Sequence, residues 1–129
     1  GVMCLVLIND CNIASASACG SIKIWEINTG VCSRTMTGHS GGVSCLVLIN
    51  DCKIASGSYD KSIKIWDINT GICLRTMTGH SDDVYSIGKL NENRIISGSF
   101  DKSIKIWSLD SGECKKTIKT EYQVRSLSI

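Results

Sequence analysis

The sequence predicts an all-β protein in which three four-stranded antiparallel sheets follow one another along the chain. Two observations carry this prediction. The pentapeptide Ser-Ile-Lys-Ile-Trp begins at Ser21, Ser62 and Ser103, so it recurs every 41 residues. Residues 1–41 and 42–82 are identical at 31 of 41 aligned positions, and a third unit keeps the same skeleton from Val84 onward. A period of this length is typical of proteins built from stacked structural repeats.

Each repeat divides into four short segments of strand-like sequence, which the second repeat shows clearly. Val43–Ile49 is a run of β-branched and aliphatic residues, as expected for a strand buried on both faces. Lys53–Ser58 follows a turn at Asn50–Asp51 and forms the second segment. Ile63–Ile68 alternates apolar and polar residues with the period of two of a β-strand. Cys73–Met77 is the fourth segment.

The connections between these segments carry turn signals. Asp60 can accept hydrogen bonds from backbone amides at a tight bend, and Asn69–Gly71 is a hairpin signal in which the glycine can take a positive φ. The repeats are expected to span residues 1–41, 42–82 and 83–119. Residues 120–129 are expected to begin a further unit, with Val124–Ile129 as its inner strand.

Composition excludes several classes of protein. The chain is 43% hydrophobic and 20% charged with a net charge of +2, so it has no basic arm for nucleic acid. Its longest apolar run, Cys4–Ile8, is too short to cross a bilayer. The basic residues Arg34, Arg75 and Lys115–Lys116 are expected to be solvated strand ends. The sequence predicts no cofactor, no nucleic acid and no membrane partner.

The eight cysteines are predicted to be buried thiols that act as small hydrophobic residues. Seven of them occupy positions that recur between repeats, and Cys19 is the exception. Equivalent positions of successive sheets lie too far apart for a disulfide, and the clustered spacing of a zinc site is missing. A thiol-rich chain of this kind indicates a reducing compartment, the cytoplasm or the nucleus.

Gly79–His80, followed by Ser-Gly-Ser-Phe-Asp at 97–101 and Ile-Lys-Ile-Trp at 104–107, resembles the WD-repeat family of β-propellers. The resemblance covers essentially the whole chain, although a literal Trp-Asp pair occurs only at Trp66–Asp67. It implies that each sheet is one propeller blade and that the chain is a half-propeller or a fragment of a larger ring.

The resemblance also implies that a hydrogen-bonded tetrad of His, Ser, Asp and Trp stabilises each complete blade. The matching residues are His39, Ser56, Asp60 and Trp66 in the second unit, and His80, Ser97, Asp101 and Trp107 in the third. Ser58 and Ser99 are alternatives for the serine. The first unit has Cys19 in place of the aspartate, and Glu121 stands where the next Gly-His histidine is expected.

The same residue types spell a Ser–His–Asp triad, so a hydrolase is an alternative interpretation. No Gly-x-Ser-x-Gly elbow occurs, and the set recurs as a scaffold feature in two units. The family resemblance therefore predicts a protein that is not an enzyme and that binds protein or peptide partners through its rim loops. Tyr59, Phe100, Asp82 and Asp83 are the candidate partner-binding residues, although the two aromatic side chains could instead cover their turns.

Ring closure is a further requirement, because a propeller needs about four blades or more to close. An open arc of three blades exposes the apolar flanks of its end sheets. Either the remaining blades of a larger propeller cover them, or two copies associate as a homodimer with a six-bladed ring. A self-assembling structural unit with no dedicated ligand is the second alternative function.

Overall fold

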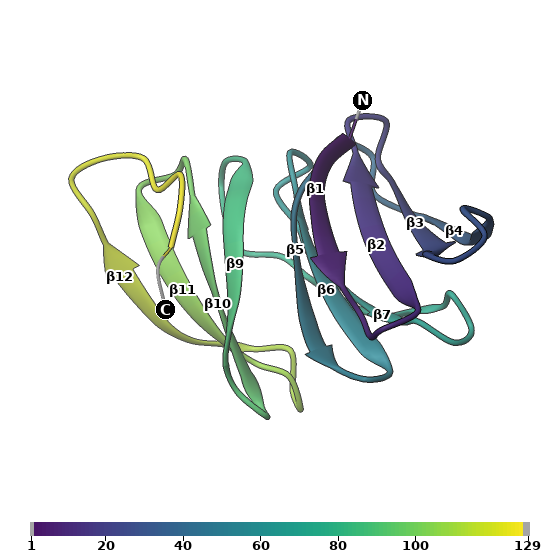
Figure 1. Cartoon of the computed structure of the whole chain (residues 1–129). Helices are drawn as coiled ribbons and strands as arrows, with labels where there is room; N and C mark the ends of the chain where they lie inside the picture. The colour runs from purple at the N-terminus through teal and green to yellow at the C-terminus, as the bar shows by residue number, and fades with distance from the viewer. Residues whose placement is uncertain (1, 128–129) are drawn as a thin grey trace.

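The structure is a computed structural model that describes residues 2–127, and these residues form twelve strands and no helix. Each of three antiparallel sheets contains four strands in chain order, and Figure 1 shows the sheets standing side by side. The predicted fold class is therefore confirmed. The strands are β1 (Val2–Leu7), β2 (Asn12–Ser17), β3 (Ser21–Glu26) and β4 (Cys32–Thr37) in sheet 1; β5 (Val43–Asn50), β6 (Lys53–Ser58), β7 (Ile63–Asp67) and β8 (Cys73–Met77) in sheet 2; and β9 (Val84–Asn91), β10 (Arg94–Ser99), β11 (Ser103–Ser108) and β12 (Cys114–Lys119) in sheet 3.

The turn between the second and third strands of each sheet has the same backbone shape. Lys61 and Lys102 take positive φ angles of 73° and 66°, and Gly20 takes 91° at the same place in sheet 1. A Cβ atom on Gly20 would lie 2.9 Å from the His39 carbonyl oxygen and 3.0 Å from that of Gly41. Glycine is therefore the residue that fits this turn in sheet 1.

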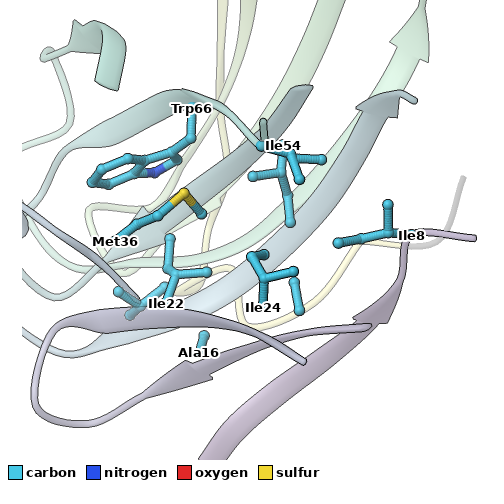
Figure 2. Close-up of a cluster of buried hydrophobic side chains, with 10 residues drawn as sticks. Ile8, Ala16, Ile22, Ile24, Met36, Ile54 and Trp66 are labelled. Atoms are coloured by element: carbon cyan, nitrogen blue, oxygen red, sulfur yellow. The ribbon is translucent and has the colours of Figure 1, made fainter. Parts of the chain in front are cut away.

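One apolar layer fills the gap between sheet 1 and sheet 2. Trp66 is 1% exposed in this layer, and Ile54 and Ile22 are fully buried. Figure 2 shows these side chains with Ile8, Ala16, Ile24 and Met36, which come from both sheets. The alternating pattern of each strand directs one set of side chains into this gap and the other set toward the opposite face.

A second layer with the same construction fills the gap between sheet 2 and sheet 3. Its members include Ile63 and Met77 from sheet 2, and Ile95 and Trp107 from sheet 3. The sheets approach closely here, because a Cβ atom on Gly57 would lie 2.8 Å from the nearest Val84 methyl carbon. Each sheet is thus stabilised mainly by its neighbours.

Two arginines also join successive sheets at their outer edges. The Arg34 guanidinium donates to the carbonyl oxygens of Thr70 (2.9 Å) and Asn69 (2.6 Å) in the β7–β8 hairpin. Arg75 makes the same pair of bonds to the β11–β12 hairpin, at 2.8 and 3.1 Å. The prediction that these arginines are solvated strand ends is therefore wrong, since each one connects its sheet to the next.

The prediction that the thiols are buried is wrong for most of them. Cys45 alone is buried, because it faces the gap between sheets 2 and 3. Cys11 and Cys52 are exposed because they lie in hairpin turns, and Cys114 is exposed on the outermost strand of sheet 3. All eight cysteines, each within the described residues, are free thiols.

The predicted inner strand Val124–Ile129 is not formed over Val124–Leu127, and residues 128 and 129 lie outside the described residues. Val124 is nevertheless buried above Gly98, and its amide donates to the Ser99 carbonyl oxygen over 2.9 Å. A strand needs a neighbour with which to pair, and the described residues offer none at this place.

The described part of the chain contains no helix of the length and hydropathy needed to cross a membrane.

Candidate functional site

A hydrogen-bonded chain of four side chains joins sheet 2 to the loop that precedes it. The Trp66 indole donates to the Ser56 hydroxyl over 2.8 Å. The Ser56 hydroxyl lies 2.6 Å from His39 Nε2, and His39 Nδ1 lies 2.8 Å from an Asp60 carboxylate oxygen. Because a carboxylate only accepts, Nδ1 carries the proton and Nε2 accepts from the serine.

Sheet 3 repeats this chain of bonds with nearly the same geometry. The distances are 2.8 Å from Trp107 Nε1 to Ser97 Oγ, 2.7 Å from Ser97 Oγ to His80 Nε2, and 2.8 Å from His80 Nδ1 to Asp101. The structure thus brings together all eight residues that the family resemblance assigned to tetrads.

The choice between neighbouring serines follows from the pleat of β6 and β10. Ser56 and Ser97 point toward the tryptophan, whereas Ser58 donates to the carbonyl oxygen of Gly42 (2.9 Å) and Ser99 to that of Asp82 (3.2 Å). Ser58 and Ser99 therefore tie the start of the inner strand to the turn and are not tetrad members.

Sequence reasoning missed a fifth member of each network. The Ser62 hydroxyl donates to Asp60 over 2.6 Å, and the Ser103 hydroxyl donates to Asp101 over 2.5 Å. Both serines open the repeated Ser-Ile-Lys-Ile-Trp pentapeptide, so their recurrence was the available signal.

These bonds keep the histidines neutral and the aspartates ionised. Burial lowers the pKa of His39 and of His80 more than the neighbouring carboxylate raises it. Burial alone would raise the pKa of Asp60, but hydrogen bonds from Ser62 and His39 outweigh it and lower that pKa to about 2. Asp101 has the same balance and a pKa of about 2.

The tetrad serines are poorly placed for nucleophilic attack. Ser56 and Ser97 are fully buried, and each hydroxyl is bonded to both an indole and an imidazole. Attack on a substrate requires an accessible serine oxygen beside an oxyanion hole. The geometry therefore supports a structural role for this set. Within the described residues, no group of three or more potential metal ligands comes together.

Sheet 1 carries only part of the network. Trp25 donates to Ser15 over 2.9 Å, but the tryptophan is half-buried, whereas Trp66 and Trp107 are 1% exposed. Cys19 takes the place of the aspartate, and its sulfur lies 2.7 Å from the Ser17 hydroxyl. Hydrogen bonds, above all from Ser17, lower the pKa of this exposed thiol to about 7.

The turns that carry the tetrad aspartates also carry an aromatic patch, which we define as Tyr59, Tyr85 and Phe100. Tyr85 and Phe100 stack with ring centres 3.8 Å apart and planes 11° apart. Tyr59 lies on the other side, with its ring centre 5.3 Å from that of Tyr85. The Arg125 guanidinium carbon lies 5.6 Å from the centre of the Phe100 ring. The structure therefore brings the two predicted aromatic residues onto one surface.

Tyr85 is the member of this patch that sequence reasoning missed. It follows Val84 at the start of β9, where the other repeats have Ser44 and Met3. An aromatic side chain where the equivalent residues are not aromatic was the available signal. Its ring fills the space between the two turns, and the Tyr85 hydroxyl helps to raise the pKa of Tyr59 to about 12.

Asp82 and Asp83, defined here as the acidic pair, lie beside the aromatic patch. The Asp83 carbonyl oxygen accepts from the Phe100 amide over 3.0 Å, and the Asp83 charge also contributes to the raised pKa of Tyr59. Burial and then the charge of Asp82 raise the pKa of Asp83, although Lys61 partly offsets this. A cation on a partner would relieve this unfavourable charge.

Asp101→Ala is expected to lower the free energy of unfolding by about 1–3 kcal/mol, because it leaves a buried imidazole and hydroxyl without their partner. Chemical denaturation measures the change. Asp110→Ala, which removes an exposed carboxylate from the next hairpin, is the matched control and should change stability by less than about 0.5 kcal/mol. Equal effects of the two variants would contradict a tetrad role for Asp101.

Stability is expected to fall as the pH falls below 6.5, the ordinary pKa of histidine. The unfolded chain then binds protons at both histidines while the folded chain keeps them neutral, so protonation favours unfolding. Asp60 and Asp101 add a second loss only below their ordinary pKa of 3.8.

Denaturation midpoints at about pH 7.5 and about pH 5.5 test this expectation. A His39→Gln and His80→Gln double variant should be less stable but nearly independent of pH over this range. A wild-type chain with equal stability at both pH values would contradict the neutral state of the histidines.

Comparisons with known proteins agree with this geometry. A family model described as "WD domain, G-beta repeat" matches residues 30–67 and 71–108, more than half of the chain. A search of curated proteins found no match.

Solved structures extend the agreement to three dimensions. The WD40 β-propeller domain of Doa1 superposes with a TM-score of 0.93 at 30% identity, over 99% of this chain and 44% of that one. U3-55K and the WD40 repeats of RRP9 each superpose with a TM-score of 0.90 at 29% identity, over 97% of this chain and 41% of theirs. The chain therefore spans less than half the length of these structures. It belongs to the WD40-repeat family, and its three sheets are blades of a partial β-propeller.

Proposed function

We propose that this chain is a protein-interaction scaffold that binds a protein or peptide through the aromatic patch and the acidic pair. The observation that carries the proposal is the contact of Tyr59, Tyr85 and Phe100 across two neighbouring blades. WD40 propellers typically serve as such scaffolds, so the family supports this class of function.

The tetrads hold this surface in place. Tyr59 and Phe100 immediately precede Asp60 and Asp101, whose carboxylates are bonded to the backbone and to the buried histidine. A binding surface on a rigid turn loses little conformational freedom when it meets its partner. The buried polar network thus gives the aromatic rings a fixed position before any partner arrives.

The chemistry of the surface favours a basic partner segment. Aromatic faces attract ammonium and guanidinium groups, and aromatic residues are common anchors of interfaces. The raised pKa of Asp83 shows that its charge is poorly stabilised in the unbound chain. We therefore infer a peptide segment in which Lys or Arg stands next to an apolar side chain.

Peptides selected from a random displayed library on the immobilised chain test this proposal. They are expected to be enriched in Lys or Arg beside an apolar residue. A Tyr59→Ala and Phe100→Ala double variant should bind the selected peptides at least roughly tenfold more weakly, because such anchors carry much of the binding energy. Its melting temperature should stay near that of the wild type, since both side chains are only half-buried.

Tyr122→Ala is the matched control for this experiment, because Tyr122 is 78% exposed and lies outside the aromatic patch. It should bind the selected peptides as the wild type does. Equal binding by the double variant and this control would remove the proposed surface.

The partial ring also needs further blades, and we propose that its end sheets associate with other blades to complete it. The remaining blades of a longer propeller or a second copy of the chain would serve. The eight free thiols support a reducing compartment, such as the cytoplasm or the nucleus.

A further inference from the structure

Sheet 1 leaves uncovered a face whose equivalent in sheet 2 is covered. Leu5 and Ile27 on this face are 63% and 46% exposed, and a shallow hollow of about 320 Å³ beside them is lined in part by Trp25. The residues at the same positions of sheet 2, Leu46 and Ile68, pack against sheet 1. The face therefore has the composition of a blade-to-blade contact.

Sheet 3 leaves uncovered the opposite face. Leu90 and Ile118 are 43% and 40% exposed on it, whereas Ile49 and Met77 at the same positions of sheet 2 are 3% and 2% exposed against sheet 3. The uncovered faces of sheets 1 and 3 are thus the two complementary halves of one repeated contact.

A compensating pair of residues indicates that the outer face of sheet 3 is meant to be packed. In sheet 2, Val47 pairs with Ala55 across β5 and β6, and in sheet 3, Gly88 pairs with Ile96 at the same place. One replacement removes three carbon atoms and the other adds three, so the volume of the pair is conserved. Packed interiors are sensitive to volume changes of this size, whereas solvated faces are not.

The two departures from the tetrad pattern also fall on these uncovered faces. Cys19 stands 41 positions before Asp60, and Glu121 stands 41 positions after His80. In sheets 2 and 3 the histidine donates and the aspartate accepts. Glu121 can only accept when ionised, and the Cys19 thiol can donate. Both replacements therefore reverse the same hydrogen bond.

We propose that two copies of this chain close a six-bladed ring in which Glu121 of one copy accepts hydrogen bonds from Ser15 and Cys19 of the other. The inference rests on the proposed completion of the ring and names its partner. Ser15 already accepts from Trp25, which leaves its hydroxyl proton available for a carboxylate. An aspartate at position 19 would instead oppose Glu121 with a like charge.

Symmetry makes this contact close upon itself. Sheet 3 of each copy packs on sheet 1 of the other, so one two-fold axis generates both junctions and leaves no uncovered face. Six blades lie within the usual range for a propeller.

Residues 124–127 now lie over part of the outer face of sheet 3. Val124 occupies the place above Gly98 that Val84 occupies above Gly57. In the closed ring the start of β1 from the other copy takes this place, so the segment must move aside. It forms no strand in the described structure, and the Val124 amide bond to Ser99 is the contact that is lost.

Sedimentation equilibrium on the full 129-residue chain tests the proposal. The wild type is expected to dimerise, and Cys19→Asp should raise the dissociation constant by roughly tenfold or more, because two carboxylates then meet. Glu121→His combined with Cys19→Asp recreates the network of sheets 2 and 3 and should return the dissociation constant to the wild-type value or below it. Melting of each variant at a concentration where it is monomeric confirms that it folds.

Every result decides one part of the inference. A wild type that stays monomeric overturns the second copy as the partner, while peptide binding at the aromatic patch remains separately measurable. A dimer in which the effects of the two substitutions are independent overturns the contact between Glu121 and Cys19. Assemblies larger than a dimer overturn the closed ring.

Discussion

Each sheet of this protein has two apolar faces, and a four-stranded sheet cannot cover either of them by itself. This constraint decides which residues are buried. Sheet 2 has a neighbour on both sides, and Trp66 and Ile63 are almost fully buried there. Trp25 has the same sequence context but no neighbour on its side, and it is only half-buried. The stability of each blade therefore depends on the contacts between blades, as in other repeat proteins.

The polar groups at these contacts determine how the blades are placed. Apolar layers favour close approach but tolerate small shifts, whereas the bonds from Trp66 through Ser56 and His39 to Asp60 each require a defined distance. Because Asp60 also binds the backbone of its own turn, the order of the buried network reaches the surface at Tyr59. A structural network and a recognition surface thus share the same few residues.

Much of the fold and of the tetrads was readable from the sequence, because both repeat. A 41-residue period, alternating strands and recurring Gly-His and Trp positions predict the sheets and the residues that join them. Choices that depend on the pleat were not readable, such as Ser56 rather than Ser58. Contacts between repeats were also missed, since neither the bonds of Arg34 to the next hairpin nor the position of Tyr85 between two turns leaves a local pattern. The cysteines were wrong because composition indicated burial while their positions in turns determined exposure.

The near-identity of the first two repeats has a consequence for how the chain reaches its native state. Strands from units that share 31 of 41 residues are almost interchangeable, so β1 can pair with β6 about as well as with β2 during folding. Such exchanges produce misassembled, domain-swapped species, a characteristic failure of repeat proteins. The divergent third unit, with Gly88 and Ile96 in place of a valine and an alanine, disfavours exchange with its neighbours. Its divergence therefore gives the nascent chain one unambiguous end from which the correct order of blades can be established.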